Sequence, residues 1–231
     1  KTADTVLRRE MRQMEGSSAN NSLIDHSKVR LERLGFFKEV NVENVPVAGT
    51  NDQLDVVFTV EEQPSGSVGA SVGFAQGTGL ILGANLSENN FLGTGKQVGV
   101  GINKSTYQSS LNFSYSEPYY TIDGVSVGYS IFARETDYGD FNISSFSTNT
   151  YGASVNWSYP ISDIQRIGFG FGYENLDVST GTFDSVEITD FVTKNGNLFD
   201  VFTFNANWVK STLNRGICLL YTSPSPRDRT R

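Results

Sequence analysis

The sequence predicts a small α+β module followed by an antiparallel transmembrane β-barrel. Between residues 107 and 159, three runs of about ten residues alternate strictly between apolar and polar side chains, as tilted membrane-crossing strands do. The polar positions carry mainly Ser, Asn and Gly, which suit a water-filled lumen better than a dry core. Residues 1–62 do not show these long alternating runs. They instead show helical periodicity followed by two short alternating stretches.

The N-terminal module is expected to contain two helices and a β-hairpin. Spacing of apolar residues and capping signals predict one helix over residues 4–14 and another over about 22–34. Residues 37–45 and 54–61 alternate and predict the hairpin strands. Helices packed on one face of such a sheet make an α+β module that spans residues 1–62.

The barrel part is expected to follow a short hinge at residues 63–66 and to occupy residues 67–216. Its connections alternate between compact turns and longer polar loops, a pattern typical of outer-membrane barrels. Regular succession of alternating runs predicts about eight strands. They fall near residues 67–75, 80–86, 98–102, 107–116, 125–134, 151–159, 167–174 and 202–208.

Composition excludes several classes of function. A net charge of −7 argues against nucleic acid as a partner, and a single cysteine gives no disulfide framework. His26 is the only histidine and has no neighbouring ligand cluster, so neither a metal site nor a catalytic site is expected, and no cofactor is implied. From Cys218 the alternation ends, and residues 217–231 resemble translated sequencing-adapter read-through, which predicts a non-native tail.

Motifs of three kinds occur along residues 1–216. The first group begins with the arginine-rich run Arg8-Arg-Glu-Met-Arg-Gln-Met-Glu-Gly16. The second is the glycine-bearing run Gln63-Pro-Ser-Gly-Ser-Val-Gly-Ala-Ser-Val-Gly-Phe74. The third consists of three turns. Together they resemble the BamA family of outer-membrane β-barrel assembly factors. The first group, which also includes Lys28–Val40 and Val56–Glu62, is similar to the family's last POTRA domain. The second resembles its first barrel strand, and the turns resemble its periplasmic turns: Asn90–Lys96, Glu117–Ser126 and Leu213–Gly216.

This resemblance implies a protein that catalyses folding without covalent chemistry, and therefore not an enzyme. The barrel would lie in the outer membrane, with the POTRA domain in the periplasm and about eight of the family's sixteen strands present. Implied partners are periplasmic lipoproteins of the assembly complex, unfolded outer-membrane protein clients, and outer-membrane lipid with lipopolysaccharide. The family's first strand would template client strands at a lateral gate.

Two groups of residues are candidate sites. The lipoprotein would contact Arg8, Arg12 and Glu15, of which Arg8 and Glu15 share a helix face if the first helix extends that far. From the residues alone, a solvated face is the favoured interpretation of these charges. The glycines of the first barrel strand fit the ordinary composition of a lumen wall equally well. The client-strand edge would comprise Gly66, Ser67, Val68, Gly69, Ala70, Ser71, Val72, Gly73 and Phe74.

Two other functions remain open at this point. One is a POTRA-barrel transporter for polypeptide secretion or import, which has the same architecture. The other is a passive eight-stranded barrel, since eight strands can close. The arginine-rich motif that begins at Arg8 favours the assembly factor over the transporter, and the module joined directly to the first strand argues against the passive barrel.

Overall fold

The computed structural model describes residues 1–50, 52–76, 79–139, 145–162, 164–181, 185–211, 213–215 and 218–219. The chain divides into two compact units, one built on Lys1–Ser65, with which the residues from Lys210 onward are grouped, and one comprising Gly66–Val209. Most of the predicted tail lies outside the described residues. Only Cys218–Leu219 is described there, as the short strand β12, which pairs with β11 (Leu213–Arg215).

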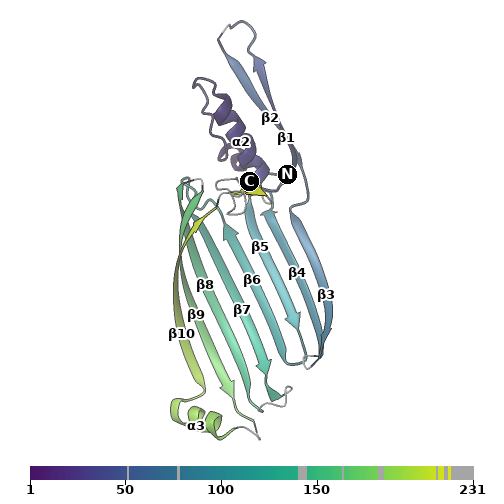
Figure 1. Cartoon of the computed structure of the whole chain (residues 1–231), viewed down its shortest axis with the longest axis vertical. Helices are drawn as coiled ribbons and strands as arrows, with labels where there is room; N and C mark the ends of the chain where they lie inside the picture. The colour runs from purple at the N-terminus through teal and green to yellow at the C-terminus, as the bar shows by residue number, and fades with distance from the viewer. Residues whose placement is uncertain are drawn as a thin grey trace, which may run out of the picture. The chain divides into compact units, whose positions relative to one another are not determined.

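The first unit confirms the predicted order of two helices and a hairpin. It contains α1 (Asp4–Arg8), α2 (Asn21–Arg33), β1 (Phe37–Pro46) and β2 (Leu54–Glu62), and the two strands pair antiparallel (Figure 1). α2 packs on the hairpin because its apolar stripe and the first residues of β1 form one buried cluster. That cluster contains Val6, Leu31, Phe36, Phe37 and Val40.

Local signals explain where α2 begins and ends. The Asn20 side chain caps the helix by accepting a hydrogen bond of 2.9 Å from the backbone N–H of Ser22. Beyond its C-terminus, Gly35 adopts a φ of 73°, a left-handed conformation that glycine tolerates best. The structure thus confirms the second predicted helix to within one or two residues.

The prediction for the first helix is wrong in length. α1 ends at Arg8, six residues before the expected end. The following segment leaves the helical path because α2 holds it: the backbone N–H of Arg12 donates a 2.8 Å hydrogen bond to Ser27 Oγ, and Glu10 forms an ion pair with Arg30. Tertiary contacts therefore override an apolar periodicity that would have continued to Met14.

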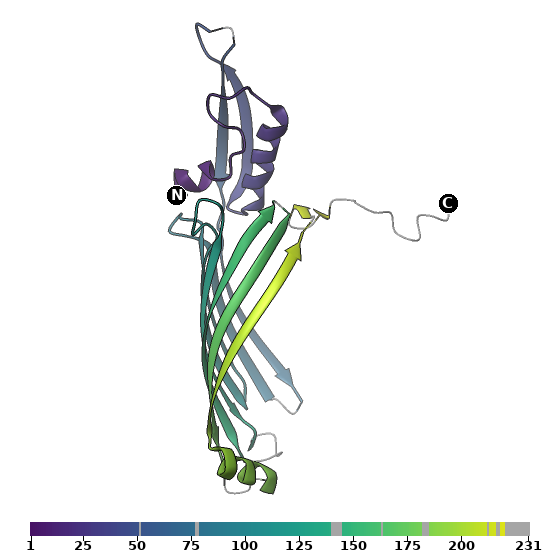
Figure 2. The same ribbon diagram turned by 90° about the vertical axis from the view of Figure 1, so that its left-hand side faces the viewer.

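The second unit is one antiparallel sheet of eight strands in sequential order, as predicted (Figure 1). Figure 2 views the sheet from the side and shows that it is curved rather than flat. The strands are β3 (Gly66–Ala75), β4 (Gly79–Phe91), β5 (Lys96–Lys104), β6 (Gln108–Glu117), β7 (Ser126–Asp137), β8 (Ser147–Ser162), β9 (Gln165–Ser179) and β10 (Leu198–Lys210).

The register gives the sheet one apolar and one polar face, which are the names used below. Successive cross-strand rows alternate between the faces because side chains alternate along each strand. One row of the apolar face runs Val68, Leu86, Val100, Phe113, Ile131, Ala153 and Tyr173. The adjacent row of the polar face runs Ser67, Ser87, Gly99, Ser114, Ser130, Ser154 and Gly172.

The connections define two ends of the sheet. The turn end carries the links β4–β5, β6–β7 and β8–β9, and the loop end carries the other four. The β4–β5 turn is held by the Asn90 side chain, whose Oδ1 accepts a 2.8 Å hydrogen bond from Gly95 N. At the loop end, the β9–β10 connection contains α3 (Val186–Asn195), where the sequence had predicted only a polar loop.

Within the described parts of the chain, none of the helices has the length and apolar character needed to cross a membrane.

Candidate functional site

The predicted client-strand edge forms a single strand, β3, at one side of the sheet. Among the described strands its only neighbour is β4, with which it forms ten residue pairs without a bulge, from Gly66 with Glu88 to Ala75 with Gly79. On its second side, backbone N–H and C=O groups have no partner strand among the described strands and are available for pairing. On the apolar face, Val68, Val72 and Phe74 are 75–82% exposed.

The three predicted edge glycines have different surroundings. A Cβ atom built on Gly66 would lie 2.5 Å from Glu88 Oε2, and one on Gly69 would lie 3.2 Å from Asn85 Cγ, so β4 side chains already cover both positions. Nothing lies within 4 Å of a Cβ built on Gly73. Gly66 and Gly69 thus accommodate side chains of the neighbouring strand, while Gly73 leaves open space.

The predicted lipoprotein-contact residues lie in the first unit around the end of α1. Arg8 Nη1 is 2.7 Å from Glu15 Oε1, and Arg8 Nε is 2.5 Å from Asp4 Oδ2, so the structure brings Arg8 and Glu15 together although the helix stops between them. The two carboxylates raise the pKa of the Arg8 guanidinium above its ordinary value, with Asp4 the larger influence. Arg12 is exposed and is anchored through its backbone to Ser27.

A buried ion pair beside this group was missed by the sequence analysis. Glu10 Oε2 is 2.7 Å from Arg30 Nη2, with side chains only 5% and 14% exposed, and Arg9 Nε lies 3.9 Å from Glu10 Oε1. The pair joins the segment after α1 to α2, and so fixes the backbone that carries Arg12 and Glu15. The spacing from Glu10 to Arg30 gave no signal, because it reflects tertiary packing rather than a helical repeat.

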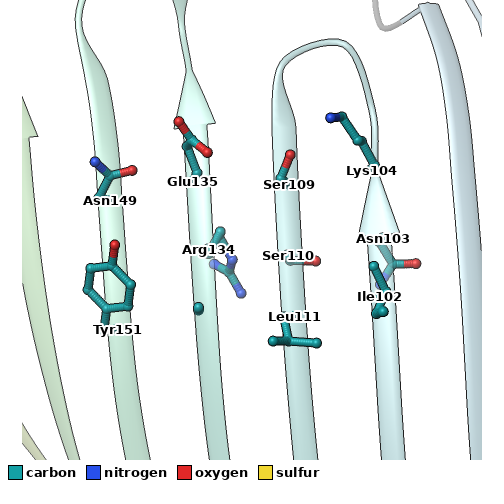
Figure 3. Close-up of a pocket in the computed structure, with 11 residues that line it drawn as sticks. Ile102, Asn103, Lys104, Ser109, Ser110, Leu111, Arg134, Glu135, Asn149 and Tyr151 are labelled. Carbon is teal, nitrogen blue, oxygen red and sulfur yellow. The ribbon is translucent and has the colours of Figure 1, made fainter.

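The apolar face changes to a polar one at the loop end of the sheet. There a shallow hollow of about 380 Å³ is lined mainly by two neighbouring rows of the same face, and also by Asn103, Ser110 and Arg134 (Figure 3). The row nearer the sheet centre is Ile102, Leu111, Ala133 and Tyr151. The row nearer the loops is Lys104, Ser109, Glu135 and Asn149.

A second polar boundary lies on this face at the turn end. Lys96 Nζ is 3.4 Å from Glu117 Oε2 and 5.9 Å from the centre of the Tyr115 ring. Along β5, Lys96 and Lys104 are eight residues apart, about 27 Å at the usual strand rise and about 20 Å after a barrel-like tilt. These two lengths bracket an apolar band of about 25 Å.

The arrangement offers surfaces for binding. Over the residues that the structure describes, no group of three or more His, Cys, Asp or Glu side chains could hold a metal ion. Among the described strands, the two-faced sheet has edges at β3 and β10, and the first unit separately carries a charged segment held by ion pairs.

Comparison with known families accounts for both units. The model of the Omp85 superfamily domain matches residues 90–218, more than half of the chain. The chain belongs to the Omp85 superfamily. A POTRA model, described as a surface antigen variable number repeat, matches residues 1–63. The protein is thus an outer-membrane barrel protein of the Omp85 superfamily with a periplasmic POTRA domain.

Similar proteins of this superfamily include outer membrane protein assembly factors named BamA. That of Neisseria meningitidis serogroup B is 37% identical over 198 residues, covering 85% of this chain and 25% of its own length. That of Buchnera aphidicola is 32% identical over 178 residues, covering 77% of this chain and 29% of its own length. The chain thus spans about a quarter of the length of these Omp85 relatives.

Solved structures show the same architecture. The crystal structure of BamA from Haemophilus ducreyi lacking POTRA domains 1–3 is similar with a TM-score of 0.72 and 31% identity, over 94% of this chain and 43% of that one. CdiB from Acinetobacter baumannii has a TM-score of 0.57 at 14% identity, over 90% of this chain and 39% of that one, and shares the fold alone. The likeness to the Haemophilus ducreyi structure, with the family matches, confirms a POTRA segment followed by part of an Omp85 barrel.

Proposed function

We propose that the protein of which this chain is part assembles β-barrel proteins into the outer membrane by templating their strands on β3. The observation that carries the proposal is the edge of β3, which has a neighbour on one side only among the described strands. Similarity to assembly factors named BamA over 85% of the chain supports the same activity.

The physical basis of templating is β-augmentation. An extended client segment gains a ladder of backbone hydrogen bonds when it pairs with a strand edge, and alternate side chains face lipid and lumen in the register that the template imposes. β3 is ten residues long, the length of one membrane crossing, and its apolar side chains lie on the same face as the rest of the wall. A client strand added there would extend the apolar face, and its polar side chains would lie on the polar face, away from lipid.

The POTRA domain would dock a periplasmic lipoprotein through Arg8, Arg12 and Glu15. These side chains lie on a segment held to α2 by the buried Glu10–Arg30 pair and by the Arg12–Ser27 hydrogen bond. A surface that is already ordered loses little conformational entropy when a partner binds, which favours affinity. The remaining proposed partners are unfolded outer-membrane proteins, lipid and lipopolysaccharide, with no covalent step in the reaction.

Depletion of the protein in its host tests this function. We expect many unrelated outer-membrane barrels to decrease together in quantitative proteomics of the outer membrane, while inner-membrane proteins keep their levels. Loss of a single secreted client, with other barrels unchanged, would instead indicate a polypeptide transporter. Unchanged levels of all barrel proteins would fit a passive barrel and contradict the proposal.

A further inference from the structure

Asparagine side chains lie flat over glycines of the neighbouring strand on the polar face of the sheet. A Cβ built on Gly101 would lie 2.9 Å from Asn112 Nδ2, one on Gly168 would lie 3.2 Å from Asn207 Cγ, and one on Gly170 would lie 2.7 Å from Asn205 Nδ2. Each glycine therefore leaves the space that a cross-strand amide occupies.

At the edge of the sheet the same arrangement has an open side. Asn85 of β4 pairs with Gly69 of β3, and its Cγ and Nδ2 lie 3.2 and 3.3 Å from a Cβ built on Gly69. Among the described strands, β3 has no further neighbour beyond Gly69. The amide of Asn85 thus lies where a side chain of residue 69 would lie, on the strand that has no second neighbour among the described strands.

We infer that Asn85 selects the side chain that a client strand places opposite Gly69. This inference rests on the proposed function, because it assigns specificity to the edge that the function uses. Directly opposed Cβ atoms in antiparallel strands are about 4.5–5.5 Å apart. An amide that already lies over Gly69 can therefore reach a hydroxyl or amide at the opposing position.

The favoured occupant is a client strand with Ser, Thr, Asn or Gln at that position. Such a residue satisfies the Asn85 amide, whereas Leu or Val would cover it without offering a hydrogen bond. The position faces the lumen side of a growing barrel, where clients carry small polar residues in any case. Asn85 therefore favours the register in which the polar side chains of the incoming strand face the lumen, because a shift of one residue would place a lipid-facing side chain against the Asn85 amide.

Disulfide trapping tests the inference in the full-length protein, reconstituted in liposomes. The variant Ser71→Cys, with any other cysteine of the protein replaced by Ser, carries one cysteine two residues from Gly69 on the same face. The probe is an eight-stranded outer-membrane barrel protein presented unfolded in urea, with a cysteine placed to oppose residue 71. Its residue opposing Gly69 is Ser in one version and Leu in another.

We expect the Ser version to be trapped about fivefold more than the Leu version, the factor that one net hydrogen bond of about 1 kcal/mol provides. Adding Asn85→Ala should make the two versions equal. Adding Asn112→Ala should leave the preference intact, because that amide lies over Gly101 in the interior of the sheet. Heat-modifiable migration in gels confirms that each variant is folded.

Four outcomes would overturn the inference. Equal trapping of Ser and Leu versions, or a preference that survives Asn85→Ala, refutes the role of Asn85 and leaves the proposed function standing. Absence of any client adduct refutes strand pairing at β3, and with it both proposals. Disulfide-linked dimers of the protein without client adducts would assign the edge to a second copy of the chain.

Discussion

The buried Glu10–Arg30 pair gives the sharpest prediction about the POTRA domain. Glu10→Gln keeps the shape of the side chain but removes the charge opposite a guanidinium that is only 14% exposed. Removing one partner of a buried pair costs about 3–5 kcal/mol. Because Gln still accepts one hydrogen bond and Arg30 keeps some solvent, we expect a loss of about 2–3 kcal/mol in the free energy of unfolding of this domain.

Pulse proteolysis in increasing urea measures this loss in the full-length protein. Cleavage products within residues 1–65 report the POTRA domain, and with a urea dependence of about 1 kcal/mol per molar the midpoint should fall by about 2–3 M. Glu15→Gln is the matched control, since its ion pair with Arg8 is 89% exposed on the glutamate side and solvent screening leaves it little influence on stability. Equal midpoints for Glu10→Gln and Glu15→Gln would refute the reasoning.

Two further predictions concern the apolar face and pH. Ile131→Arg should lower the free energy of unfolding of the reconstituted barrel in urea by about 2–4 kcal/mol, because Ile131 lies on the apolar face. The control Ser130→Arg, on the polar face, should be tolerated. Equal losses for the two variants would contradict the assignment of faces. The Thr2 backbone N–H donates a hydrogen bond to Glu62 and lowers the pKa of that carboxyl. The stability that this contact gives the POTRA domain is present above the ordinary glutamate pKa and is lost as the pH falls through the lowered pKa of Glu62. Pulse proteolysis across this acid range should show a shallower pH dependence for Glu62→Gln, and an unchanged dependence would exclude the contact as its cause.

Alternation predicted the strands well because the register places every second residue on one face of a single wall. All eight expected strands are present, and the observed ones extend further at several ends, as in β8 (Ser147–Ser162) and β9 (Gln165–Ser179). The helices were less predictable. α1 is short because contacts to Ser27 and Arg30 draw the chain away, and no local signal reports such contacts.

α3 was missed although local signals were present. Ser185 accepts a hydrogen bond from Ile188 N as an N-cap, and Gly196, with a φ of 85°, follows the last turn. Ile188 and Val192 are spaced by one turn and are half-buried, but the surrounding polar residues obscured this short stripe. Giving the helix-capping signals more weight than the overall polarity of the segment would have predicted this helix.

The candidate sites could be placed only in part from the sequence. Alternation assigned Gly69 to the polar face, but only the register shows that Asn85 lies over it, since a shift of two residues would pair Gly69 with a different side chain. Likewise, the predicted grouping of Arg8 with Glu15 is observed, but through a turn after the helix rather than along a shared helix face.

The central claim is that client strands pair with β3, and photocrosslinking in living cells tests it most directly. A photoreactive amino acid at Ser71 of β3 is compared with one at Ser110 of β6, which lies in the same row of the same face but in the interior of the sheet. We predict adducts with several outer-membrane barrel proteins at Ser71 and none at Ser110. Equal adducts at both positions, or none at Ser71, would contradict the account.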